Sequence, residues 1–507
     1  MSRVRQRMHI SKRDYPVRFG LLLSALALPA CTVGPDYQAP TVATPAHWTE
    51  PLPTAPDAEA KELGQWWRGF KDRRLDALIE RALQGNLDLQ GATARLSASR
   101  AQLKVAAAER WPSLGASGGY QRERISPNAI KGLIGSAIGN GGASNGLLSN
   151  LGPVGDPFNL FLAGFDSTWE LDFFGGIQRK VEAAQANSQA MEEGRRDIRV
   201  SLAAEVAREY LGMTALRHRL DLAKQRLENQ RKIRELAEAA FDEGLASALD
   251  VKRAKAAWEL AKAGLPPIDA QIKNTGHRLA VLLGQPPGAM DAEWGAVGQD
   301  LPAPPALQPV MPSDLLRRRP DIRQAERNLA ASTASVGAAV AELFPKISLT
   351  GSVGFQSQDL SNFTNFSSGF YGFGPRLSLP IFQAGRLLAN IDAQEARTAE
   401  ALKAYEKTVL TAFREVEDAL AELNAEQRRL QDLTAAAATS RSAAEAALAF
   451  YEEGEADMQT VLDANRVWFD AEEQWVLSEQ AWATGHVALY KALGGGWEME
   501  GSTTPSP

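Results

Sequence analysis

The sequence predicts a mixed fold in which short β-strands of a shared membrane barrel are joined to long α-helices that stand in water. Three observations predict it. Two long stretches, Gly176 to Glu243 and Gly385 to Glu453, lack proline and are rich in helix-forming residues. Four shorter stretches alternate apolar and polar residues, as strands with two different faces do. These elements occur twice in the same order, so the chain reads as two copies of one unit.

The composition excludes several classes of protein. The 507 residues include 55 basic and 61 acidic side chains, a net charge of −6, whereas a nucleic-acid binder needs a clustered basic excess. The single cysteine excludes an intrachain disulfide and every cysteine-based zinc cluster. The five histidines are too dispersed to form a metal-binding pair on one helix face. No Walker or dinucleotide motif is present, so we expect neither a metal nor a cofactor.

The first thirty residues have the order of a secretory signal peptide. Six basic side chains precede an apolar run from Phe19 to Leu28, and the small residues Pro29 and Ala30 then lead to Cys31. Leu28 to Cys31 resembles the lipobox of bacterial lipoproteins, which implies that Cys31 is lipid-modified and becomes the mature N-terminus. Thr32 is not an aspartate, which by the same resemblance implies the outer membrane. Removal of residues 1–30 leaves 49 basic against 60 acidic side chains, a net charge of −11.

Three short matches in the same order define the internal repeat. Ala108 to Pro112 recurs as Ala341 to Pro345, and Phe241 to Gly244 recurs as Tyr451 to Gly454. Leu249-Asp250 recurs as Leu462-Asp463, which makes Asp250 the predicted counterpart of Asp463. The predicted organisation is a signal peptide (1–30), a lipidated segment (31–70), a first repeat (71–284) with a Gly-rich loop (126–156) and a helical tip near 244, a Pro-rich connector (285–312), a second repeat (313–493) with a tip near 454, and a flexible tail (494–507).

The two proline-free stretches predict helices roughly 100 Å long if they are continuous. They are too charged to lie in a bilayer, and no apolar run in the chain reaches the ~18 residues that a spanning helix needs. By themselves they would fit a helical bundle or a coiled coil. Apolar residues at spacings of four and three form a packing stripe on the first stretch: Leu202, Val206, Tyr210, Met213, Leu216 and Leu220.

The strands favour a membrane barrel. Runs of ~9 to 11 residues that are aromatic-rich on one face and hydrophilic on the other are typical of barrels with a wet lumen. A soluble half-buried sheet gives the same alternation, but the lipoprotein start and the aromatic flanks favour the barrel. Bacterial barrels begin at about eight strands, and an open sheet edge in lipid is prohibitive, so identical chains must share the barrel. The predicted strands are Ser113–Arg122, Phe161–Phe173, Ile347–Gln356 and Phe370–Leu379.

Four segments carry a resemblance to a known family: Arg318 to Glu326, Ala341 to Leu349, Cys31 to Tyr37 and Tyr451 to Arg466. They resemble TolC-like outer-membrane factors, and most closely the lipoprotein (NodT/OprM-like) branch that serves resistance-nodulation-division (RND) efflux pumps. The resemblance implies a homotrimer with twelve strands in one barrel, twelve helices in a periplasmic tunnel and a mixed α/β belt. It further implies a passive exit duct for drugs or other small molecules, which works with a periplasmic adaptor and an inner-membrane RND transporter.

The same resemblance implies roles for residues beside the second tip. Asp463 would form a ring of three carboxylates at the closed aperture, and Asp250 is the weaker candidate there. Arg466 would pair with acidic groups on a neighbouring helix and latch the tip shut. Tyr451 matches the aromatic position before the tip glycine, whereas Gln459 replaces an apolar residue of the family. From the residues alone, either aspartate could simply be a solvated carboxylate near a helix N-terminus.

The tips themselves are the predicted contacts of the adaptor. A glycine at each tip permits the positive φ that a tight turn needs, and this alone would account for the glycines. The resemblance adds that small residues let adaptor hairpins approach. The predicted contact residues are Gly244, Leu245, Ala246, Gly454, Glu455 and Ala456.

Two alternatives stay open at this stage. The exit duct of a type I protein-secretion system would share the fold, although the lipoprotein start disfavours it. A lipid-anchored hydrolase could use Ser117, which lies in a G-x-S-x-G match from Gly115 to Gly119. A nucleophile elbow requires a helix directly after the serine, and a Gly-rich segment follows here, so we interpret the match as accidental.

Overall fold

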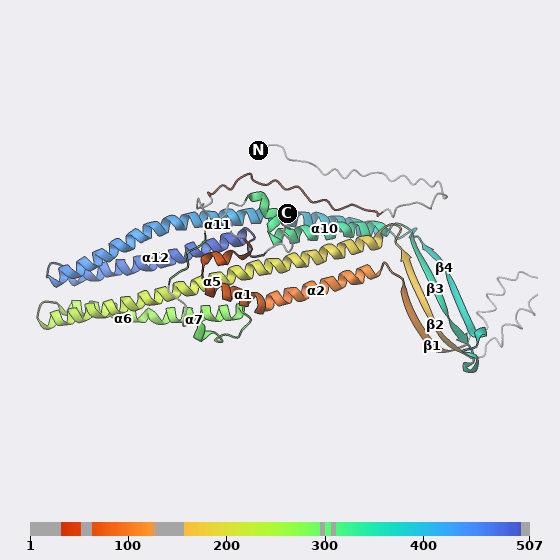
Figure 1. Cartoon of the computed structure of the whole chain (residues 1–507), viewed down its shortest axis with the longest axis horizontal. Helices are drawn as coiled ribbons and strands as arrows, with labels where there is room; N and C mark the ends of the chain where they lie inside the picture. The colour runs from red at the N-terminus through yellow and green to blue at the C-terminus, as the bar shows by residue number, and fades with distance from the viewer. Residues whose placement is uncertain are drawn as a thin grey trace, which may run out of the picture. The chain divides into compact units, whose positions relative to one another are not determined.

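The computed structural model describes residues 32–51, 63–124, 126, 157–294, 300–305 and 311–497. Cys31 and most of the predicted loop 126–156 therefore lie outside the described residues. The chain divides into two compact units (Figure 1). The sheet unit comprises Pro112–Gly176 and Phe344–Pro380, with the described chain up to Val33. The helical unit comprises Gly34–Trp111, Ile177–Leu343 and the chain from Ile381 onward.

The sheet unit is one antiparallel sheet of four strands in the order β1-β2-β3-β4. All four predicted strands are confirmed, with ends that differ by at most three residues. The chain between β3 and β4 forms two short 3₁₀ turns, η3 (Leu360–Asn362) and η4 (Phe366–Ser368). The strands are β1 (Ser113–Glu123), β2 (Phe158–Leu171), β3 (Lys346–Ser357) and β4 (Gly369–Ser378).

The register keeps the two faces of this sheet chemically distinct. Glu170 lies opposite Ser348, which in turn lies opposite Arg376, so these polar residues share one face. The other face carries aromatic residues such as Tyr371 and Phe373, which are 80% and 82% exposed in the single chain. Among the described residues, β1 and β4 each pair on one side only. A single chain therefore leaves two sheet edges and one apolar face uncovered.

The helical unit contains both repeats of the predicted pattern. Its described helices include the two 3₁₀ segments η1 and η2 and the two single-turn helices α8 and α9, and Figure 1 labels the longer helices. Within this part of the chain, no helix combines the length and the apolar character needed to cross a bilayer. The helices are η1 (Leu63–Phe70), α1 (Arg73–Gly85), α2 (Leu87–Ala108), α5 (Gly176–Asp242), α6 (Ala248–Ala263), α7 (Leu265–Leu282), α8 (Asp291–Trp294), η2 (Pro312–Asp314), α9 (Leu315–Arg318), α10 (Pro320–Ala341), α11 (Arg386–Glu452) and α12 (Met458–Ala492).

The repeat is visible in the helix lengths. Helices α2 and α10 both have 22 residues, and α5 and α11 both have 67. The returning helix differs between the copies, because α12 runs unbroken for 35 residues whereas the first copy is interrupted at Gly264. Gly264 keeps helical angles, with φ −73° and ψ −21°. Pro266 and Pro267 follow it and have no amide hydrogen to donate to the preceding turn, which divides the returning helix of the first copy into α6 and α7.

The main core surrounds the middle of α5, and the predicted stripe accounts for only part of it. Leu202, Val206, Tyr210 and Met213 are buried, and the Tyr210 hydroxyl donates to Asp72 at 2.6 Å. Leu216 and Leu220 are only half-buried. From Arg219 onward, ion pairs connect α5 to α12: Arg219–Glu473 at 2.5 Å and Arg226–Asp470 at 3.6 Å. The main apolar core therefore does not extend to the helix tips.

The segment after Val33 is a strap along the helical unit. The buried Arg179 of α5 pairs with Asp36 at 2.7 Å. The Tyr37 hydroxyl donates to Glu326 of α10 at 3.0 Å. Further on, the backbone N–H groups of residues 49 and 50 donate to the Glu417 carboxylate of α11 at 2.8 and 3.2 Å. These contacts fix the described N-terminal segment to three helices.

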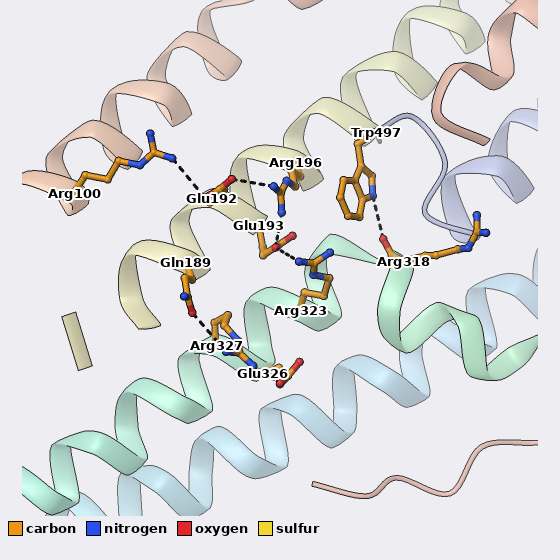
Figure 2. Close-up of polar contacts among 10 residues, drawn as sticks. All are labelled: Arg100, Gln189, Glu192, Glu193, Arg196, Arg318, Arg323, Glu326, Arg327 and Trp497. Carbon is orange, nitrogen blue, oxygen red and sulfur yellow. Dashed lines mark hydrogen bonds and ion pairs between the residues drawn. The ribbon is translucent and has the colours of Figure 1, made fainter. Parts of the chain in front are cut away.

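Trp497, near the end of the described chain, lies close to two guanidinium groups (Figure 2). Arg196 of α5 and Arg323 of α10 lie 4.9 and 5.2 Å from the indole ring, and the indole N–H donates to the Arg318 carbonyl at 3.0 Å. The same two arginines donate to the buried Glu193 carboxylate at 2.6 and 2.7 Å. Burial raises the pKa of the Glu193 carboxyl in spite of these cations. Trp497 therefore closes a polar network that joins α5 to α10.

Trp497→Ala is expected to destabilise the helical unit by about 3 kcal/mol, because truncating a largely buried tryptophan leaves a cavity. Trp497→Phe keeps an aromatic face for both guanidinium groups but removes the N–H donor, so it should cost markedly less. Urea denaturation of both purified variants followed by circular dichroism measures the difference. Equal destabilisation by the two substitutions would contradict the stacking described here.

His486 is the buried histidine of α12. Its Nδ1 lies 2.9 Å from the Trp482 carbonyl, and its ring packs edge-on against Trp482. Burial lowers the pKa of His486 below its ordinary value of 6.5, although the Trp482 carbonyl opposes this shift. The unfolded chain therefore binds a proton more readily than the folded chain does. The stability that His486 contributes is present above pH 6.5 and is lost as the pH falls.

His486→Gln is expected to reduce the fall in thermal stability between pH 7.5 and pH 5, because glutamine can donate to the Trp482 carbonyl and does not titrate. The melting midpoint at several pH values measures this, with the exposed His47→Gln as the matched control. Parallel pH profiles for wild type and H486Q would show that the histidine does not titrate on unfolding.

Candidate functional site at the helix tips

The two helical hairpins of the chain end in equivalent tight turns. Gly244 and Gly454 have φ of +77° and +79°, and a Cβ atom at either position would meet nothing within 4 Å. The requirement for glycine is therefore one of backbone conformation and not of space. The N–H of Leu245 donates to the Ala240 carbonyl at 2.8 Å, and the N–H of Glu455 donates to the Phe450 carbonyl at 2.7 Å.

Each returning helix begins with a side-chain cap three residues after the tip glycine. Ser247 caps α6 in a reciprocal capping box, in which the Asp250 N–H donates to the Ser247 hydroxyl at 3.2 Å and the Ser247 N–H donates to the Asp250 carboxylate at 3.1 Å. Asp457 caps α12 by accepting from the Thr460 N–H at 2.8 Å. Asp250 is thus engaged in holding the first turn of α6.

This capping geometry corrects the predicted equivalence of Asp250 and Asp463. Ser247 corresponds to Asp457, so Asp250 corresponds to Thr460, and the position equivalent to Asp463 is occupied by Arg253. The match between Leu249-Asp250 and Leu462-Asp463 is displaced by three residues, about one helical turn. The two tips therefore present opposite charges at the same level of their returning helices.

A small apolar cluster joins the two hairpins just behind the tips. Ile233 and Ala237 of α5, Ala254 of α6, and Met458 and Val461 of α12 are all buried together. Tyr451 packs against this cluster from α11. Burial raises the pKa of the Tyr451 hydroxyl, and the negative charge of Asp250 raises it further. The tip is consequently a packed unit to which α5, α6, α11 and α12 all contribute residues.

Asp463 and Arg466 interact within their own helix. Asp463 accepts a hydrogen bond from the Gln459 amide at 2.9 Å, and its carboxylate lies 3.6 Å from the Arg466 guanidinium. In the single chain Arg466 pairs with Asp463 of its own helix, and the pairing with acidic groups on a neighbouring helix stays a prediction. Both side chains remain about half-exposed. From the sequence, Gln459 was noted only because it replaces an apolar residue of the family. In the structure its amide orients the Asp463 carboxylate.

The predicted contact residues form an exposed end. Leu245 is 79% exposed, Gly244, Gly454 and Glu455 are exposed, and the two alanines beside them, Ala246 and Ala456, are partly buried. Sequence reasoning missed the cap residues Ser247 and Asp457, although the pattern of a serine followed three residues later by an acid is a known start signal for a helix.

Two further possibilities raised by the sequence concern Ser117 and metal binding. Ser117 lies in the middle of β1, where it pairs with Gly164, so it is not at a strand-to-helix elbow. Within residues 32–497, the described parts hold no cluster of three His, Cys, Asp or Glu side chains that could bind a metal ion.

The sheet, the paired long hairpins and the capped tips together define an outer-membrane channel component. The family model of the outer membrane efflux protein matches residues 78–285 and 311–495. The chain belongs to this family and is the outer-membrane duct of an efflux pump.

Individual relatives match along nearly the whole chain. The antibiotic efflux pump outer membrane protein ArpC of Pseudomonas putida is 33% identical over 488 residues, which cover 94% of this chain and 95% of that protein. The cation efflux system protein CusC of Escherichia coli O157:H7 is 31% identical over 483 residues, covering 94% and 98%. The solved outer-membrane channel OprN superimposes with a TM-score of 0.82 at 35% identity, covering 92% of this chain and all of that one.

Asp250→Ala is expected to weaken the first turn of α6 by about 1 kcal/mol, because it removes half of a capping box. Hydrogen exchange at residues 247–251 should accelerate about fivefold as a result. Asp432→Ala, at an exposed position in the middle of α11, is the control. Unchanged exchange near the tip in D250A would mean that the capping box contributes nothing in solution.

Proposed function

We propose that three copies of this chain form one continuous duct that passively exports small molecules through the outer membrane. Twelve strands form the barrel, twelve helices form a periplasmic tunnel, and a small α/β belt surrounds the tunnel. The proposal rests on the sheet, because four strands are fewer than any bacterial barrel uses and both edges lack partners in one chain. The exposed aromatic face of the sheet would then meet lipid, and its polar face would line the lumen.

The helix tips would receive the partners of the pump. A periplasmic adaptor would contact Gly244 to Ala246 and Gly454 to Ala456, and an inner-membrane RND transporter would supply the energy. Lipid-modified Cys31 would anchor the chain in the outer membrane. The cargo class stays broad, because ArpC and CusC are named for antibiotics and cations and yet share 33% and 31% identity with this chain.

The aperture would be set by three copies of Asp463. Gln459 and Arg466 hold this carboxylate from the same helix, so the ring would keep a defined orientation at the narrow end. A ring of carboxylates favours cations and resists anions. Opening would proceed by untwisting of the two hairpins of each chain, which increases the distance between the carboxylates.

Asp463→Asn is expected to lower the cation preference of single channels in planar bilayers, because it removes three negative charges from the aperture. Arg466→Gln should change conductance by releasing one restraint on the same carboxylate. Asp432→Asn removes an exposed carboxylate far from the tip and serves as the control. If conductance and ion selectivity stay at wild-type values in both tip variants, the aperture does not lie at Asp463. Crosslinking of the detergent-purified protein, with a trimer as the expected product, tests the assembly separately.

A further inference from the structure

A cavity of about 270 Å³ lies between the N-terminal strap and the helices α5 and α10. All the residues that line it belong to the helical unit. On α5 they end at Gln189, roughly 80 Å along the helix from the tip glycine Gly244. The cavity is therefore separate from the aperture and from the contacts proposed for the adaptor. Its polar lining consists of Tyr37, Arg179, Glu182, Gln185, Gln189 and Arg327.

Close packing of two backbones fixes the strap beside this cavity. Gly34 has φ +87°, and a Cβ atom there would lie 2.4 Å from the Cα atom of Gly337 in α10. A Cβ atom on Gly337 would in turn meet the Arg179 side chain at 2.9 Å. The Arg179 side chain is only 5% exposed, and it donates to Asp36 at 2.7 Å and to Glu182 at 2.8 Å. One wall of the cavity is therefore fixed before any ligand binds.

The α10 wall offers hydrogen-bond donors. Arg327 donates to Glu326 and, at 3.5 Å, to Gln189 of α5, which faces it in Figure 2. Its guanidinium also lies 5.6 Å from the centre of the Tyr37 ring. A guanidinium has five N–H donors, so these two hydrogen bonds leave donors for a ligand. Because its planar fork matches the geometry of phosphate oxygens, an arginine in this position suits a phosphate group.

The α5 wall offers acceptors. Glu182, Gln185 and Gln189 are spaced by three and four residues, so they share one face of the helix. The carboxylates of Glu182 and Asp36 share the single charge of Arg179, which leaves one negative charge without a counterpart. A purely anionic ligand would be repelled there, and a purely cationic ligand would leave the donors of the α10 wall unused. The lining therefore matches a ligand that carries both a phosphate and an ammonium group.

The chain brings this cavity close to the predicted membrane anchor. Pro35 lines the cavity and follows Cys31 by four residues, so their Cα atoms are at most about 14 Å apart. Arg179 follows Leu171, the last residue of β2, by eight residues. The polar headgroup layer on one side of a bilayer is roughly 5 to 8 Å thick. Lipid headgroups are therefore the phosphate and ammonium groups within reach of the cavity.

We propose that this cavity binds the phosphoethanolamine headgroup of a membrane lipid, with the phosphate at Arg327 and the ammonium at Glu182. The site rests on the proposed function in one respect, because lipid-modified Cys31 would hold the strap at the periplasmic surface of the outer membrane. The cavity is smaller than the ~300 to 1,000 Å³ of sites for drug-sized ligands, so it admits the headgroup and leaves the acyl chains outside. A bound lipid would join the strap to α5 and α10.

Native mass spectrometry of the mature, detergent-purified protein with added lipids tests the site. The chain should retain phosphatidylethanolamine about tenfold more tightly than phosphatidylcholine, whose ammonium has no N–H, or phosphatidylglycerol, which has no ammonium. Arg327→Gln should weaken this retention about tenfold, because it removes a charged donor to the phosphate. Ala334→Leu fills the cavity without changing a charge and should weaken it as well. Arg414→Gln, at an exposed position of α11, is the matched control. Equal retention of the three lipids, or wild-type retention by both cavity variants, would overturn the site.

Two further readouts separate the source of the headgroup from the proposed duct. Free phosphoethanolamine should displace the lipid only at about a hundredfold excess, because no acyl chain holds it beside the site in the micelle. Displacement at an equal concentration would overturn the assignment to a lipid. The same spectra give the acyl mass on Cys31 and the number of chains. If acylated trimers retain no phosphatidylethanolamine, the headgroup site is wrong and the duct stands. If the chain retains this lipid but is neither acylated nor trimeric, the duct fails and the headgroup site stands.

Discussion

An unpaired strand edge cannot persist in hydrocarbon, because each exposed N–H and C=O group there lacks both water and a partner. In the described part of the chain the sheet has four strands and two edges without a partner strand, so this constraint would apply to any assembly of the chain in a membrane. Each repeat supplies one strand pair and one long hairpin. The internal duplication thus contributes equally to the sheet and to the helices, as the matched lengths of α5 and α11 illustrate.

The strands and the long helices could be predicted from the sequence because both depend on local patterns. Alternation at a period of two located β1 to β4 within three residues, and the absence of proline located α5 and α11. The division of the first returning helix at Gly264 was not predicted, although Pro266 and Pro267, which lack amide hydrogens, indicate it. The end of the main core near Met213 could not be predicted, since Leu216 and Leu220 continue the apolar spacing but are only half-buried in the structure.

The candidate site was predicted in location but not in its pairings. The tip glycines follow from the need for a positive φ in a tight turn, and both have it. The predicted equivalence of Asp250 and Asp463 was wrong because it relied on the shared Leu-Asp sequence. The caps Ser247 and Asp457 define which positions of the two returning helices are equivalent. The partner of Arg466 depends on side-chain directions and on which helix packs beside α12, and neither can be read from one sequence.

The interruption at Gly264 makes the two hairpins mechanically unequal. Two missing amide donors at Pro266 and Pro267 remove hydrogen bonds that would resist bending at that point, roughly 24 Å from the start of α6. Helix α12, in contrast, is continuous over 35 residues, and Leu489 and Tyr490 near its C-terminal end are buried in the main core. We expect the first hairpin to bend more easily near this joint than the second hairpin, in which α12 is continuous over 35 residues.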